Sequence, residues 1–202
     1  MSVNLEKPYA LSCDRNRDPI LEIIRQYLAE PATVLEIASG TGQHGLHFTK
    51  AMPHLSWQCS DLPANLPGIQ IWLDEAGLSN TPAAVALDVN QIQWPLENMD
   101  VIFTANSLHI MSWDSVKELF ERAKTLLQFN GQLIVYGPFN YNGEYSSESN
   151  QQFDQWLLNR DPQSAIRHFE DVCQLAEQAG LSLIQDHPMP ANNRCIVWKK
   201  TA

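Results

Sequence analysis

Residues 36–45 read EIASGTGQHG and contain glycines at positions 40, 42 and 45, in the pattern G-x-G-x-x-G. The residues before them, TVLEIA at 33–38, form a short apolar run rich in β-branched side chains, which is typical of a buried strand. The residues after them have a helical pattern that ends near Pro53. Because glycine adopts backbone conformations that are closed to other residues, this spacing lets a chain turn sharply from strand to helix. The stretch therefore predicts a strand, a tight loop and a helix.

The same alternation extends in both directions. A helix over residues 17–28 is predicted before the first strand, with Asp18 as its cap and Pro19 at its first position. A later helix is predicted to begin with a capping box from Ser115 to Glu118. Further strands are predicted at 55–60, 83–89, 100–105, 132–137, 181–186 and 195–199, with helices at 67–76 and 164–180.

Strands that alternate with helices need crossover connections, and these give a parallel sheet. We expect an α/β fold with a Rossmann-like, doubly wound, mostly parallel sheet of seven strands, an antiparallel final strand pair and helices on both faces. A chain of 202 residues without a linker or repeat predicts a single domain over 1–202. Within it, residues 1–18 are predicted to form an N-terminal flap and residues 138–152 a lid loop over a substrate.

The amino-acid composition limits the kinds of partner that the protein is expected to bind. The net charge is −10 and the 13 Lys and Arg residues are scattered, which disfavours nucleic acid as a partner. No run approaches the roughly 18 apolar residues of a membrane span, and the first residues lack a signal-peptide core. The four cysteines form no C-x-x-C pair. We therefore expect a cytoplasmic protein with a small-molecule partner and no membrane attachment, and composition leaves the oligomeric state open.

Two ligands fit the glycine loop. A nicotinamide dinucleotide would place its pyrophosphate on the loop amides and a ribose hydroxyl on Asp61. S-adenosylmethionine instead carries an ammonium and a sulfonium and no phosphate. Glu36, at the mouth of the expected site, would repel a pyrophosphate and attract a cation, while Asp61 suits ribose hydroxyls and Asp88 the adenine amino group. The acids favour S-adenosylmethionine and leave a nicotinamide-dependent oxidoreductase as an alternative.

Several segments resemble the class I S-adenosylmethionine-dependent methyltransferases, namely VLEIASGTG (34–42), CSD (59–61), ALDV (86–89), DVIFTANSLHI (100–110) and LLQFNGQLIVYGPF (126–139). More narrowly, CDRNRDPIL (13–21), YGPFNYNGEYSSESNQQFD (136–154) and MPANNR (189–194) resemble the branch called domain of unknown function 938, which includes methyltransferase-like protein 26. The resemblance implies S-adenosylmethionine as cofactor and methyl transfer as activity. It implies cofactor contacts at Glu36, Ala38, Ser39, Gly40, Gly42, Asp61, Leu62, Asp88, Val89, Asn106 and Ser107.

This sequence departs from the family's pattern at two points. Ala38 stands where the family's first motif usually has a glycine, which narrows the freedom of the backbone there. The sequence ANSLH follows the fourth predicted strand in place of an NPPY-like motif, so amino methylation of nucleic acids is not supported.

Methyl transfer needs alignment of the acceptor more than a dedicated base. The candidates for a base are His109, Tyr136 and Tyr141. Contacts with the substrate or lid are expected at Tyr9, Arg15, Asn16, Phe139, Tyr141 and Tyr145. His44 and His47 have no evident third ligand, so no metal site is predicted. A protein of this fold that binds the cofactor without catalysis and acts through a partner is a further alternative, and the sequence does not specify the acceptor.

Overall fold

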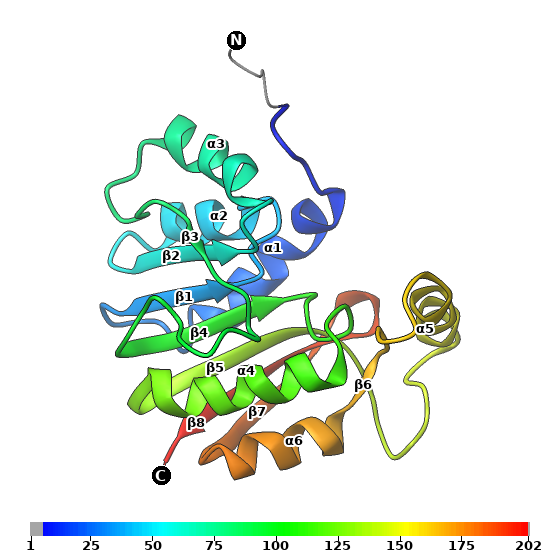
Figure 1. Cartoon of the computed structure of the whole chain (residues 1–202). Helices are drawn as coiled ribbons and strands as arrows, with labels where there is room; N and C mark the ends of the chain where they lie inside the picture. The colour runs from blue at the N-terminus through cyan, green and yellow to red at the C-terminus, as the bar shows by residue number, and fades with distance from the viewer. Residues whose placement is uncertain (1–5, 202) are drawn as a thin grey trace. The chain divides into compact units, whose positions relative to one another are not determined.

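The computed structural model of the protein describes residues 6–201. The chain divides into two compact units, one ending at Phe103 and the other beginning at Thr104. The strands of the first unit lie in the order β3-β2-β1-β4, and those of the second in the order β5-β8-β7, with β6 paired to β5 off this path (Figure 1). The strand at the boundary between the units is β4 (Met99–Ala105).

The first unit contains the parallel strands β1, β2 and β3. The helix α1 packs against α2, and both α2 and α3 pack against β2 (Figure 1). Its core includes the rings of Phe48, Trp57 and Phe103, whose centroids lie 5.3 to 5.6 Å apart. The elements are α1 (Leu11–Ile24), β1 (Thr33–Ile37), α2 (Gln43–Ala51), β2 (Ser56–Asp61), α3 (Leu66–Ala76) and β3 (Val85–Ala86).

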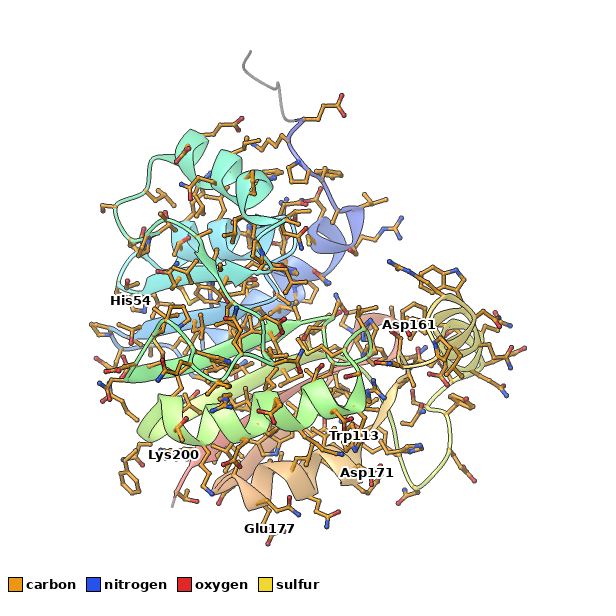
Figure 2. The ribbon with its side chains drawn as sticks, viewed as in Figure 1. His54, Trp113, Asp161, Asp171, Glu177 and Lys200 are labelled. Atoms are coloured by element: carbon orange, nitrogen blue, oxygen red, sulfur yellow. The ribbon has the colours of Figure 1, made fainter. Side chains whose placement is uncertain are left out.

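In the second unit β5 pairs antiparallel with β8, and β8 with β7. The helices α4 and α6 pack side by side (Figure 1). Lys200 at the end of β8 donates to the carbonyl oxygens of Lys124 and Leu127, at 2.6 and 2.8 Å, and so caps the carboxyl end of α4 (Figure 2). The elements are α4 (Trp113–Leu126), β5 (Leu127–Asn140), α5 (Glu148–Arg160), β6 (Arg167–His168), α6 (Phe169–Gln178), β7 (Leu181–Met189), the 3₁₀ turn η1 (Pro190–Asn192) and β8 (Asn193–Lys200).

The predicted fold class is confirmed, because the sheet is mixed and mostly parallel with an antiparallel end pair. The predicted start of the first helix is wrong. The helix begins at Leu11, has no side-chain cap, and carries Pro19 in its interior. Asn16, Ile20 and Ile24 are buried at a spacing of four residues, so one continuous inner face holds the helix together across the proline.

Three other predictions need correction. The cap of α4 is Ser112, whose hydroxyl accepts from the Ser115 amide, rather than Ser115 itself. The third strand is shorter than predicted and contains only Val85 and Ala86. The helix predicted over 164–180 begins at Phe169, because residues 167 and 168 pair with β5 as β6.

The segment 138–152 contains more regular structure than its composition suggested. Residues 138–140 continue β5, and α5 begins at Glu148. Between them Tyr141 and Glu144 exchange main-chain hydrogen bonds across Asn142 and Gly143, both of which have positive φ. This is a tight hairpin turn with the Asn-Gly pair that such turns favour.

Candidate functional site

The glycine loop after β1 is a tightly wound turn. Its backbone is left-handed at every second residue, with φ of 56° at Ala38, 61° at Gly40 and 83° at Gly42. Glycine adopts this conformation freely, whereas Ala38 is strained there by about 1 kcal/mol. The Gly42 amide donates to the Ser39 carbonyl oxygen at 2.9 Å, and Gly42 is the N-cap of α2. The loop therefore delivers the chain directly into the N-terminus of a helix.

Asp61, at the end of β2, is fixed against this loop. Its Oδ2 accepts from the Gly40 amide at 2.7 Å. Its Oδ1 accepts from the Leu62 amide at 2.7 Å and from the Asn65 side chain at 2.8 Å. The residue is only 6% exposed. A carboxylate oxygen can accept two hydrogen bonds, so Oδ2 keeps one acceptor position for a ligand hydroxyl.

Glu36 is buried inside the first unit, which differs from the expected position at the mouth of a site. It is 1% exposed, and its Oε2 accepts from the Trp57 indole at 3.0 Å and from the Cys59 thiol at 3.5 Å. Burial raises the pKa of its carboxyl from 4.5 to about 7, although the hydrogen bonds oppose this shift. At neutral pH this group therefore does not carry a full charge, and its contact with a cofactor stays a prediction.

Asp88 uses its carboxylate to close its own turn. Oδ1 accepts from the main-chain and side-chain nitrogens of Asn90, both at 2.9 Å. The next residue, Val89, is buried, while Leu62 after β2 is largely exposed. The predicted adenine contact of Asp88 would use its second oxygen.

The N-terminal segment packs on the helices beside the glycine loop. The Ala10 amide donates to Gln43 Oε1 at 2.6 Å, and the Trp72 indole donates to the Pro8 carbonyl oxygen at 2.7 Å. Asn16 Oδ1 lies 2.7 Å from His44 Nε2 in the interior. Of the three predicted flap contacts, Asn16 is buried, whereas Tyr9 and Arg15 are exposed.

Pro8 packs so closely on Gly68 of α3 that a Cβ there would lie 2.7 Å from Pro8 Cγ. We expect Gly68→Ala to loosen the segment without unfolding the protein, since alanine itself favours helix. Hydrogen exchange of the Ala10 amide, which donates to Gln43, should accelerate about tenfold. Asp74→Ala, exposed on the same helix, serves as the control. Unchanged exchange in Gly68→Ala would show that the contact with Pro8 does not hold the segment.

Two of the predicted cofactor contacts, Asn106 and Ser107, lie in the second unit. Asn106 has φ of 55°, and its main-chain amide donates to the Tyr136 carbonyl oxygen at 2.8 Å. The hydroxyls of Ser107 and Thr104 lie 2.5 Å apart. His109 is buried, and burial lowers its pKa to about 4. A group with this pKa is a weak base at neutral pH. Tyr136 and Phe139 lie in the core.

Tyr141 is held by neighbours on two sides. Its hydroxyl donates to Asp186 at 2.8 Å, and its ring stacks on Phe169 at 5.0 Å. Arg194 lies 5.5 Å from the ring and pairs with Asp186 at 2.7 Å. Burial, followed by the hydrogen bond to Asp186, raises the pKa of the phenol well above its usual value, so Tyr141 is a poor base at neutral pH.

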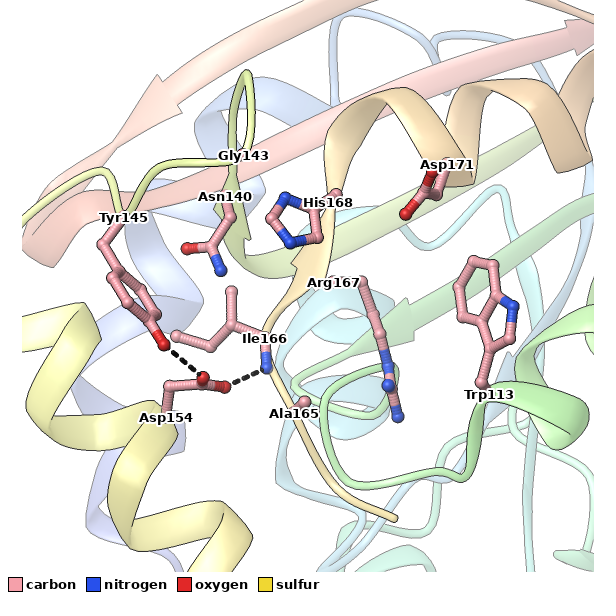
Figure 3. A pocket seen from close by; sticks show the side chains of 10 residues that line it. All are labelled: Trp113, Asn140, Gly143, Tyr145, Asp154, Ala165, Ile166, Arg167, His168 and Asp171. Atoms are coloured by element: carbon pink, nitrogen blue, oxygen red, sulfur yellow. Dashed lines mark hydrogen bonds between the residues drawn. The ribbon is translucent and has the colours of Figure 1, made fainter. Parts of the chain in front are cut away.

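A hollow of about 360 Å³ in the second unit was missed by sequence reasoning. Figure 3 shows it between the end of β5, β6, the middle of α5 and the first turns of α4 and α6. Tyr145, a predicted lid residue, lines it and donates its hydroxyl to Asp154 at 2.9 Å. The available signal was the spacing of Asn150, Asp154 and Leu157, which are the buried residues of α5.

Among residues 6–201 there is no group of three or more His, Cys, Asp or Glu side chains that could hold a metal ion. No helix in the described part of the chain combines the length and apolar character that a membrane crossing requires.

The fold is that of S-adenosylmethionine-dependent methyltransferases. An O-methyltransferase family protein from Burkholderia thailandensis matches with a TM-score of 0.82 and 14% identity, over 95% of this chain and 58% of that one. The apo form of the S-adenosylmethionine-dependent methyltransferase SibL matches at 0.81 with 17% identity, over 95% and 56%. PigF with SAH matches at 0.77 with 18% identity, over 94% and 63%. This chain thus spans little more than half of each neighbour.

The chain belongs to the family described as protein of unknown function (DUF938), whose model matches residues 7–200. This agrees with the resemblance found at residues 13–21, 136–154 and 189–194. At the identities above, the solved structures establish a shared fold, and the activity has to be argued from the residues of this chain.

Proposed function

We propose that this protein is an S-adenosylmethionine-dependent methyltransferase with a small-molecule acceptor, of the branch that includes methyltransferase-like protein 26. The observation that carries the proposal is the hydrogen bond from the Gly40 amide to the carboxylate of Asp61. It joins a left-handed glycine loop to an acidic strand end, within a fold shared with solved methyltransferases. The cofactor would be held by residues 38–42, Asp61 and Leu62.

The donor set of the loop supports this cofactor over a nicotinamide dinucleotide. A pyrophosphate needs free amides, yet the Gly40 and Gly42 amides already donate to Asp61 and Ser39. The carboxylate also brings negative charge to the loop, which opposes a phosphate and favours a ligand with cationic groups and ribose hydroxyls. When bound, S-adenosylmethionine supplies an electrophilic methyl group on its sulfonium.

Residues behind the loop keep it in shape. The Ser60 hydroxyl donates to the Glu36 carbonyl oxygen at 2.7 Å, and the Ser60 amide donates to the Ser39 hydroxyl at 3.1 Å. The proposed roles of Glu36 and Ser39 are therefore to position the loop, with Asp88 and Val89 beside the adenine. Asn106 and Ser107 remain proposed contacts from the second unit.

The histidine and tyrosine candidates support transfer without a strong base. His109 has a lowered pKa of about 4, and the pKa of Tyr141 is raised. The protein would therefore act mainly by alignment and exclusion of water. This supports an acceptor in which the group that receives the methyl loses its proton easily, without help from a basic side chain.

Calorimetric titration with S-adenosylmethionine, S-adenosylhomocysteine and NAD tests the cofactor. We expect the first two to bind and NAD not to bind. Asp61→Asn keeps the shape of the side chain, removes its charge and turns an NH2 group towards an N–H donor on one side, and it should weaken binding by at least about thirtyfold, or about 2 kcal/mol. Asp74→Asn, at an exposed position of α3, is the matched control.

Binding of NAD alone would instead support an oxidoreductase. Unchanged affinity in Asp61→Asn, with an unchanged melting temperature, would remove Asp61 from the site. Cofactor binding without methylated product on a broad acceptor panel would favour the non-catalytic alternative, in which the protein acts through a partner.

A further inference from the structure

The hollow of the second unit contains a buried side-chain oxygen for which residues 6–201 supply no hydrogen-bond donor. Asn140, the last residue of β5, is 4% exposed, and its Oδ1 is buried without a hydrogen-bond partner. Figure 3 shows its amide turned into the hollow, between Tyr145 and His168. A buried carbonyl oxygen without a donor is rare and destabilising in a folded protein. Its position in a cavity calls for a ligand that supplies an O–H or N–H group.

The charged groups around the hollow disfavour an anionic ligand. Arg167 directs its N–H groups at main-chain oxygens, with distances of 3.0 Å to Leu108 and 2.9 Å to Gln163 and a shorter contact to Met111. In Figure 3 its guanidinium lies away from Asn140. It is therefore held as a structural cation rather than presented to a ligand.

Two carboxylates line the same hollow. Asp154 accepts from the Tyr145 hydroxyl at 2.9 Å and from the Ile166 amide at 2.6 Å. Asp171, in the first turn of α6, is exposed, and Figure 3 shows its carboxylate facing the hollow. Negative charge at the rim favours neutral or cationic molecules over anions.

Flat side chains complete the lining. Trp113, at the start of α4, and the rings of Tyr145 and His168 border the cavity. The guanidinium of Arg167 lies 5.8 Å from the Trp113 ring, which helps to fix that ring. A cavity of about 360 Å³ in which these aromatic side chains alternate with polar and charged ones has the size of a small-molecule site.

We propose that this hollow binds a small aromatic molecule, uncharged or cationic, whose O–H or N–H group donates to Asn140 Oδ1. That this molecule is the methyl acceptor rests on the proposed function. That it binds in the hollow does not depend on the proposed function. On this proposal Asn140 recognises the ligand, and its unsatisfied oxygen lowers the stability of the protein without the ligand.

Amide NMR titration of the full chain without cofactor tests the site, so its outcome is independent of the cofactor titration. Three probes share one phenol and differ in charge: 4-ethylphenol is neutral, tyramine is cationic and 4-hydroxyphenylacetate is anionic. We expect the first two, at up to about 10 mM, to shift the amides of residues 140, 145 and 166–168. The anion should bind at least about fivefold more weakly than tyramine.

Two variants separate the hydrogen bond from the charge. Asn140→Leu should weaken 4-ethylphenol binding about tenfold and raise the melting temperature by about 2–4 °C, because it removes an unsatisfied buried group. Asn159→Leu, the same change at an exposed position of α5, should leave binding unaltered. Asp171→Asn, at an exposed rim position, should reduce the preference for tyramine over the anion.

Absence of shifts with all three probes, or tightest binding of the anion, would overturn the proposal. Unchanged affinity in a folded Asn140→Leu would also overturn it. If that variant does not fold, the change of charge preference in Asp171→Asn decides.

Discussion

Replacing Gly45 by alanine is expected to lower the free energy of unfolding by about 3 kcal/mol. Gly45 lies in α2, where alanine alone would stabilise the helix by about 1 kcal/mol. Its Cβ, however, would lie 2.6 Å from Cys59 Sγ, 2.8 Å from Glu36 Oε2 and 3.0 Å from Trp57 Nε1. All three side chains are buried, and Glu36 Oε2 accepts hydrogen bonds from the other two atoms, so none can move aside cheaply. Urea denaturation at neutral pH measures the effect.

Gly137→Ala is the matched control, because the nearest atom to its Cβ would be His109 Nδ1 at 3.7 Å, an ordinary contact. Cys59→Ala in the Gly45→Ala background should recover about 1 kcal/mol by removing the closest atom. A Gly45→Ala protein as stable as the control would mean that helix and sheet are not packed at this distance.

The part of the fold that sequence predicted best is the strand, loop and helix around Gly40. Its signals are local, since the glycines mark left-handed turns and the apolar run before them marks a buried strand. The close approach at Gly45 follows from the third glycine of the same pattern. The position of Asp61 at the end of β2 was predictable because strand ends are recognisable once the alternation of elements is known, and its contact with a cofactor stays a prediction.

The errors arose where tertiary contacts override local signals. Pro19 is a start signal in sequence, yet α1 continues through it because Asn16 and Ile20 belong to one buried face. Ser115 has the spacing of a capping box with Glu118, yet the helix is capped by Ser112, whose hydroxyl accepts from the Ser115 amide. The unpartnered oxygen of Asn140 has no sequence signal, since it depends on the absence of a donor in three dimensions.

Glu36 illustrates the same limit in electrostatics. Sequence identified an acid at a strand end and assigned it a charge at the mouth of a site. The carboxyl instead faces Trp57 and Cys59, and burial raises its pKa to about 7. The fixed negative charge at the loop therefore comes from Asp61, which is hydrogen-bonded to Gly40.

The raised pKa of Glu36 predicts a pH-dependent stability term of about 3 kcal/mol. The folded protein holds this proton more tightly than the unfolded chain, whose carboxyl has the ordinary pKa of 4.5. The term is therefore fully present below about pH 4.5 and is lost as the pH rises through about 7. Each pKa unit corresponds to about 1.4 kcal/mol, so the rise from 4.5 to about 7 gives a pH-dependent contribution of about 3 kcal/mol to the free energy of unfolding.

Glu36→Gln isolates this term because glutamine still accepts from the Trp57 indole but does not titrate. Relative to the original protein, the variant should gain about 3 kcal/mol of unfolding free energy between about pH 4.5 and pH 8. His44 and His109, whose pKa values are lowered to about 4, also titrate within the folded protein, but they are common to both proteins and cancel in the difference. Glu30→Gln, at an exposed position, is the matched control, and a difference for Glu36→Gln no larger than that of the control would mean that Glu36 is ionised throughout this range.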